Sequence, residues 1–138
     1  MDSNELRKLG YNYQYGIEVE KDEKKAFEYY MKAAELGNAV AINDVGICYE
    51  DGIGVEKDGK KAFEYYMKAA ELGNATAIYN VGICYDNGIG VEKDEKKAFE
   101  YYIKAAELGN ANAIYNAGIC YDNGIGVEKD EKKALNII

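Results

Sequence analysis

The sequence contains no histidine and no proline, and its only serine is Ser3. Without histidine there is no Ser-His or Cys-His nucleophile pair and no imidazole ligand for a metal ion. A single serine near the terminus also leaves no Ser-x-x-Lys site of the penicillin-recognising type. We therefore expect that the protein is not an enzyme, and that it has neither a cofactor nor a metal site.

Long apolar runs are missing as well. None comes near the roughly 20 apolar residues that a membrane-spanning helix needs, and residues 1–10 lack the apolar core of a signal peptide. No Pro/Ser-rich stretch divides the 138 residues, so we predict a single repeat domain over residues 1–138. A cytoplasmic location and no membrane contact are the corresponding expectations.

Positive charge is also in short supply. The 25 acidic and 17 basic side chains give a net charge of -8, which repels the phosphate groups of nucleic acids. The three cysteines are Cys48, Cys84 and Cys120, spaced thirty-six residues apart. Equivalent residues of stacked helices are about 8–10 Å apart, beyond the roughly 7 Å limit for a disulfide. We therefore expect reduced thiols that pack in the core.

The chain repeats itself with the same period of thirty-six residues. The segment YYMKAAELGNA at 29–39 recurs at 65–75, and again at 101–111 with Ile103 in place of methionine. Residues 1–38 are a divergent first copy, 39–74 and 75–110 are nearly identical, and 111–138 form an incomplete last copy. A period of this length is typical of solenoids built from helix pairs.

The first helix of each repeat is expected at residues 75–87 and their equivalents. Asn74 can cap its amino end, and Gly88 can end it in a left-handed conformation. Ile78, Val81 and Tyr85 recur at helical spacing on its core face. Gly82 leaves room there for the close approach of a neighbouring helix.

The second helix is expected at residues 95–108, after a loop that contains the sequence GIGVEK. Asp94 can cap it, and Glu100 and Lys104 are spaced for an ion pair on its exposed side. A phosphate site in the loop is disfavoured because Glu92 and Asp94 stand where a phosphate would bind. The short connection to the next repeat makes the two helices antiparallel, and repetition of the pair gives an all-α superhelix.

The motif VGICYDNGIGVEKD at 81–94, continued by KA at 97–98 and YIKAAELGNA at 102–111, resembles the Sel-one-like repeat (SLR) family. These repeats are related to tetratricopeptide repeats and have a longer loop inside each repeat. The resemblance covers essentially the whole chain. It implies a right-handed superhelical solenoid of antiparallel helix pairs, adaptor and scaffold roles, and partners held on a concave surface lined by the first helices. Ala70 and Ile78 occupy the positions that form a disulfide in cysteine-rich relatives, so that bond is not expected.

A candidate groove follows from the face of each first helix that the core does not use. Residues at steps of three and four form a stripe on that face, and a solvated helix face without a function is the competing interpretation. Each of these helices places an isoleucine beside a carboxylate, and residues 39–51, 75–87 and 111–123 contain no lysine or arginine. The predicted groove residues are Asn43, Ile47, Glu50, Asp51, Thr76, Tyr79, Ile83, Asp86, Asn87, Asn112, Tyr115, Ile119, Asp122 and Asn123.

The favoured hypothesis is an interaction module whose acidic groove binds a peptide or protein with basic and apolar side chains. The alternative is a structural or regulatory solenoid attached to a catalytic domain that is missing from this chain.

The two end repeats depart from the pattern. Glu18 stands where the later copies have Gly54, Gly90 and Gly126, which leaves the conformation of the first loop open. The last repeat stops early in its second helix, with apolar residues at positions 134, 135, 137 and 138. We expect self-association or fraying through this uncapped carboxyl end, whereas the polar amino end acts as a cap.

Overall fold

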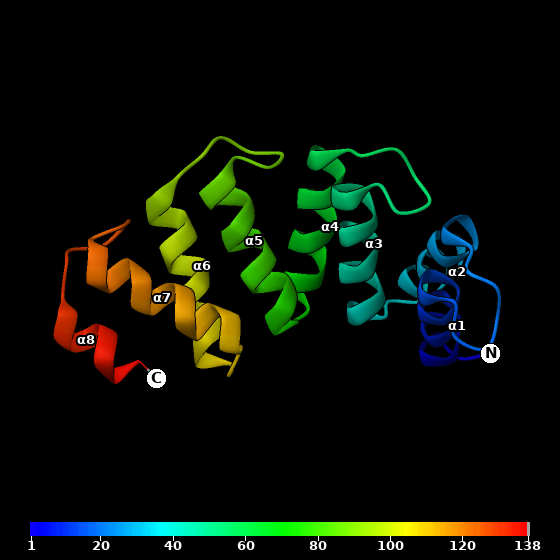
Figure 1. The fold of residues 1–138 in the computed structure, drawn as a ribbon, viewed down its shortest axis with the longest axis horizontal. Helices are drawn as coiled ribbons and strands as arrows, with labels where there is room; N and C mark the ends of the chain where they lie inside the picture. The colour runs from blue at the N-terminus through cyan, green and yellow to red at the C-terminus, as the bar shows by residue number, and fades with distance from the viewer. Residues whose placement is uncertain (138) are drawn as a thin grey trace. The chain divides into compact units, whose positions relative to one another are not determined.

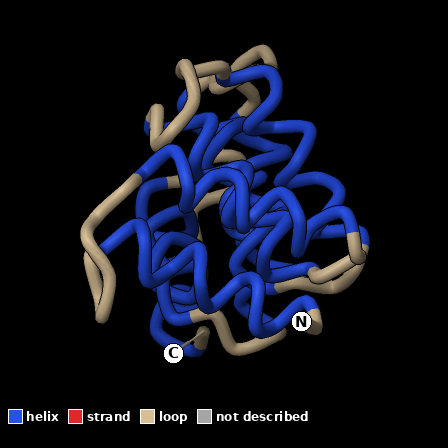
Figure 2. The backbone as a smooth tube through the Cα atoms, turned by 90° about the vertical axis from the view of Figure 1, so that its right-hand side faces the viewer, coloured by secondary structure: helices blue, strands red, loops and turns tan. Residues whose placement is uncertain are grey.

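The computed structural model describes residues 1–137, which form eight α helices and no strand (Figures 1 and 2). Close contacts group the chain into two compact units, Met1–Asn74 and Ala75–Ile138. Unit 1 contains α1 (Ser3–Tyr15), α2 (Glu23–Glu35), α3 (Ala39–Asp51) and α4 (Gly59–Glu71). Unit 2 contains α5 (Ala75–Asn87), α6 (Glu95–Glu107), α7 (Ala111–Asn123) and α8 (Glu131–Asn136).

Short polar side chains set where the helices begin. The Asp94 carboxylate accepts the backbone N–H of Lys97 at 3.0 Å, and the Asn110 side chain accepts that of Ala113 at 2.9 Å. Such caps satisfy backbone donors that have no partner inside the helix. The observed α5 has the predicted bounds, whereas α6 ends one residue early, because Leu108 is its C-cap with φ -89° and ψ 5°.

The loop inside the first repeat has the same backbone hydrogen bond as the loop inside the third repeat. The Asp94 N–H donates to the Tyr85 carbonyl at 2.8 Å, and the Asp22 N–H donates to the Tyr13 carbonyl at 2.9 Å. Glu18 takes φ 63° in this loop and is the only non-glycine residue with positive φ among residues 1–137. The conformation that the sequence left open is therefore the shared one.

A buried tyrosine fills the centre of each of the first three helix pairs. Tyr30, Tyr66 and Tyr102 are each 1% exposed. A Cβ atom added to Gly82 would lie 2.7 Å from a ring carbon of Tyr102, and Gly46 has the same relation to Tyr66 at 2.6 Å. The close approach predicted at Gly82 is confirmed, and the group that approaches is the tyrosine ring.

The three cysteines are buried and form no disulfide, as the sequence predicts. Burial raises the pKa of Cys48 to about 12 and that of Cys120 to about 11. A thiol in such surroundings behaves as a small apolar group and is a poor nucleophile.

Neighbouring repeats within a unit are joined by edge-on aromatic contacts. Phe27 on α2 meets Tyr49 on α3 with ring centroids 5.5 Å apart, and Phe99 on α6 meets Tyr121 on α7 at 5.1 Å. On α8, Ala134 is buried and Leu135 is 76% exposed. Position 138, which the sequence analysis counted among the apolar residues of the uncapped carboxyl end, lies outside the described residues.

Glu100 and Lys104 do not form the predicted ion pair in the described structure, so this prediction is wrong. The Lys104 Nζ instead lies 4.9 Å from the ring centroid of Tyr101, and Lys68 has the same relation to Tyr65 at 4.8 Å. An ammonium over an aromatic face is favourable by roughly 0.5–1 kcal/mol at exposed sites, which is enough to compete with an exposed helix ion pair.

Candidate partner-binding surface

In unit 2 the predicted stripe divides into exposed and half-buried residues. Tyr115 is 68% exposed, and its neighbours at the two ends of α5 and α7 are exposed as well. Two of the half-buried members, Tyr79 and Ile83, pack against the core. The exposed residues are Thr76, Asn87, Asn112, Tyr115, Asp122 and Asn123, and the half-buried ones are Tyr79, Ile83, Asp86 and Ile119.

Ile119 on α7 borders two hollows. The first has a volume of about 180 Å³ and is lined by the acidic residues Asp86 and Glu95 together with Tyr102, Asn116, Ile119, Cys120 and Ile125. The second has a volume of about 160 Å³ and is lined by Ile114, Tyr115, Gly118, Ile119, Asp122, Ala134 and Leu135. The stripe therefore includes a hollow lined by two acidic residues and a mainly apolar one, with one isoleucine common to both.

The Asp86 carboxylate is held in place by the core. The Tyr102 hydroxyl on α6 donates to Asp86 Oδ2 at 2.9 Å. Burial raises the pKa of Tyr102 well above its ordinary range, so the hydroxyl remains a donor at all ordinary pH values. A carboxylate can accept about four hydrogen bonds, so Asp86 keeps capacity for a further donor.

Tyr79 makes contacts within unit 2 that the sequence did not predict. Its ring centroid lies 5.8 Å from that of Tyr102, and its hydroxyl accepts a hydrogen bond from the Asn116 side chain on α7 at 3.4 Å. Part of this side chain therefore joins α5 to α7, and only the remainder is available to a partner.

Unit 1 contains the other predicted groove residues, all on α3. Asn43 is only 5% exposed, Ile47 is half-buried and Asp51 is exposed. Glu50 accepts a hydrogen bond from the Tyr66 hydroxyl at 2.6 Å, as Asp86 does from Tyr102. Asn43 therefore has little surface for a partner, and Asp51 has the most accessible carboxylate of this helix.

In unit 1, Arg7 on α1 places a positive charge near the stripe. Its Nε lies 2.8 Å from Asp44 Oδ2, and the Asp44 side chain is 14% exposed. Burial raises the pKa of Asp44 although Arg7 acts in the opposite direction. The sequence analysis treated each first helix alone and did not detect this contact between two of them.

The tyrosine hydroxyls are the functional groups that the sequence analysis missed, since it treated these residues only as core fillers. In each case the acceptor precedes the tyrosine by sixteen residues, as in the pair of Gln14 and Tyr30, whose oxygens are 2.6 Å apart. An acceptor side chain at this fixed spacing before each buried tyrosine is a signal that the sequence contains.

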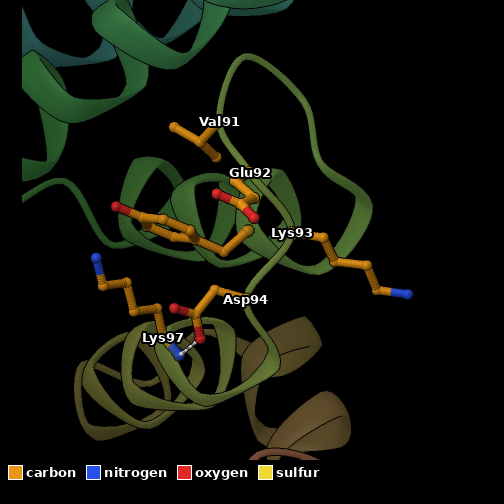
Figure 3. Close-up of a pocket in the computed structure, with 6 residues that line it drawn as sticks. Val91, Glu92, Lys93, Asp94 and Lys97 are labelled. Atoms are coloured by element: carbon orange, nitrogen blue, oxygen red, sulfur yellow. Dashed lines mark hydrogen bonds between the residues drawn. The ribbon is translucent and has the colours of Figure 1, made fainter.

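Two hollows of greater volume are lined by loop residues that do not belong to the stripe. Tyr85, Val91, Glu92, Lys93, Asp94 and Lys97 line one of about 430 Å³ (Figure 3), and the equivalent residues of the first repeat line one of about 480 Å³. In Figure 3 the Lys93 side chain points away from the other labelled side chains. The Lys97 Nζ lies 5.4 Å from the Tyr85 ring centroid. Because acidic and basic groups balance in this hollow, it has no preference for a ligand of either charge.

Residues 1–137 contain no group of three or more histidine, cysteine, aspartate or glutamate side chains that could hold a metal ion. Within the same range, no helix is both long enough and apolar enough to span a membrane.

The helix pairs recur with one period, and one kind of loop joins the two helices of each pair. This arrangement defines a helical-repeat protein. The Sel1 repeat model matches residues 6–38, 39–74, 75–110 and 111–136. The chain therefore belongs to the Sel1 repeat family, whose members generally mediate interactions between proteins. A search of curated protein sequences finds no match.

Solved structures agree with this assignment. A Sel1 repeat protein from Oxalobacter formigenes superimposes with a TM-score of 0.93 and 36% identity, over 99% of this chain and 56% of its own. A protective antigen of uropathogenic Escherichia coli gives 0.92 and 32%, over 98% of this chain and 29% of its own. Cysteine-rich protein B of Helicobacter pylori gives 0.67 and 31%, over 80% and 86%. The predicted all-helical repeat solenoid is thereby confirmed, and this chain spans about half or less of the first two relatives.

Proposed function

We propose that this chain is a protein-binding module that takes a peptide, or an extended segment of a protein, with basic and apolar side chains. The observation that carries the proposal is the pair of hollows beside Ile119. One, of about 180 Å³, is lined by the acidic residues Asp86 and Glu95. The other, of about 160 Å³, is lined mainly by apolar side chains.

The chemistry of the two hollows matches alternating side chains of a peptide. A lysine or arginine would form charge-assisted hydrogen bonds with the carboxylates of the first hollow. An apolar side chain would remove the surfaces of Tyr115 and Ile119 from water at the second. Because Ile119 borders both hollows, neighbouring residues of one peptide can reach them together.

No internal cation of α5 or α7 competes for the acidic hollow, since residues 75–87 and 111–123 contain no lysine or arginine. Unit 1 differs, because Arg7 lies against Asp44 there. We therefore propose unit 2 as the binding surface.

We also infer that the protein acts by binding and not by catalysis, because the sequence has no histidine and a single serine. The net charge of -8 disfavours nucleic acid as a partner. Three buried cysteines that form no disulfide support a location in the reducing cytoplasm.

The proposal is tested by selecting peptides from a random displayed library on the immobilised protein. Selected peptides should be rich in lysine or arginine next to apolar residues, and their affinity should fall as salt rises from 0.05 to 0.5 M, about the range over which screening sets in. Binding should weaken in Asp86→Asn, which removes the charge but keeps an acceptor for Tyr102. It should weaken further in the double variant Asp86→Asn/Asp122→Lys.

Glu100→Lys on the exposed side of α6 is the matched control, because it makes the same charge change as Asp122→Lys at an exposed site away from the two hollows. It should bind the selected peptides as the unmodified protein does. Equal loss in Glu100→Lys, or no loss in the double variant, would show that the hollows beside Ile119 are not the binding site.

A second candidate function is a structural or regulatory solenoid within a longer protein. It is favoured by the coverage of the two solved relatives, of which this chain spans 56% and 29%. In that case the double variant would leave the activity of the longer protein unchanged, whereas variants that unfold the repeats would abolish it.

A further inference from the structure

Glu18 has a backbone conformation that glycine adopts at the equivalent position of the later loops. Its φ is 63°, and Gly54 and Gly126 have φ 68° and 69° at the same position of their loops. An L-residue is strained at positive φ, by steric contact between Cβ and the backbone. The loop of the first repeat nevertheless forms, so the loop by itself does not require glycine.

The neighbouring repeat is what requires it. A Cβ atom on Gly54 would lie 2.1 Å from the carbonyl oxygen of Glu23, at the amino end of α2. A Cβ atom on Gly126 would lie 2.1 Å from the carbonyl oxygen of Glu95, at the amino end of α6. Both obstacles are helix backbone, which cannot swing aside as a flexible side chain can. Stacking of one repeat on the next therefore needs a residue without Cβ at this position.

We infer that Glu18 prevents another repeat from stacking on the outer face of the first repeat, which is the face that points away from the second repeat. The excluded partner is a helix pair that packs as α2 packs on the loop of Gly54, whether it belongs to the same chain or to a second copy. In a head-to-tail pair of copies, the atom that meets the Cβ of Glu18 would be the carbonyl oxygen of Glu131, the first residue of α8.

The face needs such a block because it is apolar. Leu9 and Tyr13 are half-buried there, whereas their counterparts in the second repeat, Val45 and Tyr49, are buried. Ile17, next to Glu18, is 42% exposed, whereas its counterparts Ile53 and Ile125 are half-buried. An apolar face that matches the other end of the same molecule favours open head-to-tail assembly. Glu18 opposes such assembly through the position of its Cβ.

The test adds one repeat in front of the full chain, as a copy of residues 39–74 joined directly to Ser3. It is made with Glu18, with Glu18→Gly and with Glu18→Ala. Hydrogen exchange in the second helix of the added repeat reports whether that repeat packs. We expect protection in the Glu18→Gly form, and exchange at least about tenfold faster in the other two. Glu18→Ala removes the charge and keeps Cβ, so it separates the two effects. Equal exchange in the Glu18 and Glu18→Gly forms would overturn the inference.

A second measurement uses the unextended chain. Gly126→Ala adds a Cβ at positive φ, and the comparison of Glu18→Gly with Glu18→Ala adds one at the same position of the first loop, but only Gly126 has a helix backbone 2.1 Å from that Cβ. Gly126→Ala should accelerate exchange in α7 by at least about tenfold more than Glu18→Ala accelerates exchange in α1 and α2 relative to Glu18→Gly. If the two additions of a Cβ accelerate exchange equally, the neighbouring backbone does not exclude a Cβ and the inference fails.

Discussion

The hydrogen bond between Tyr102 and Asp86 joins the core to the proposed binding surface, and Tyr102→Phe removes it with little other change. The ring is 1% exposed and its packing is retained, while the hydroxyl that donates to Asp86 Oδ2 at 2.9 Å is lost. Tyr30→Phe is the matched comparison, because the equally buried Tyr30 donates at 2.6 Å to the neutral amide oxygen of Gln14.

The expected magnitudes differ because the acceptors differ. A hydrogen bond to a charged group contributes roughly 1.5–3 kcal/mol to stability, and one between neutral groups roughly 0.5–1.5 kcal/mol. Asp86 is half-buried, so water replaces part of the lost interaction and the lower end of the first range applies. We expect Tyr102→Phe to cost about 1.5 kcal/mol and Tyr30→Phe about 0.5–1 kcal/mol.

Urea denaturation gives the overall loss, and native-state hydrogen exchange assigns it to a helix pair, since repeat proteins need not unfold in one step. Exchange should accelerate in α6 for Tyr102→Phe and in α2 for Tyr30→Phe. The exposed Tyr115→Phe is the control and should change stability by less than about 0.5 kcal/mol. If Tyr102→Phe costs no more than Tyr30→Phe, the charge of Asp86 adds nothing to the bond.

Three further variants test other parts of the structure. Arg7→Met should cost about 1–3 kcal/mol in urea denaturation because it leaves the Asp44 carboxylate, 14% exposed, without its donor, and adding Asp44→Asn should recover part of the loss. Burial raises the pKa of Cys48 to about 12, so the folded state keeps a proton that the unfolded state releases above about pH 8.5. Stability is therefore complete below that pH and falls as pH rises toward 12, by up to about 1.4 kcal/mol per pH unit, and Cys48→Ala should flatten the fall. Gly82→Ala should cost about 1–3 kcal/mol, because its Cβ would lie 2.7 Å from the Tyr102 ring. At Gly118, where the nearest described atom would lie at 3.6 Å, alanine should be neutral or stabilise by up to about 1 kcal/mol.

The helices and their order could be predicted because local rules decide them. Asn110 and Asp94 are recognisable caps, and their side chains do accept the expected backbone N–H groups. The small error at the end of α6 reflects a C-cap at Leu108, followed by Gly109 with φ 87°. Period and composition then give the fold class, which the solved relatives confirm.

The side-chain partners could not be predicted, because they depend on how two helices are rotated against each other. Lys104 has Glu100 within reach along its own helix and Tyr101 on the same surface, and only the packed structure shows that the ring is chosen. Arg7 and Asp44 lie on different helices, so no helical spacing relates them. The burial of Asn43 likewise follows from packing between helices and not from its place on a helical wheel.

The hydrogen-bonded tyrosines also bear on whether the acidity of the stripe has a function. A buried hydroxyl needs an acceptor, so the core by itself explains why positions 50 and 86 have side chains with an oxygen. It does not explain their charge, because Gln14 satisfies Tyr30 at 2.6 Å with a neutral amide, the same distance as between Glu50 and Tyr66. The negative charge at Glu50 and Asp86 is therefore not required to satisfy the hydroxyl. A stronger hydrogen bond is one use of that charge, and the proposed basic partner would be a second.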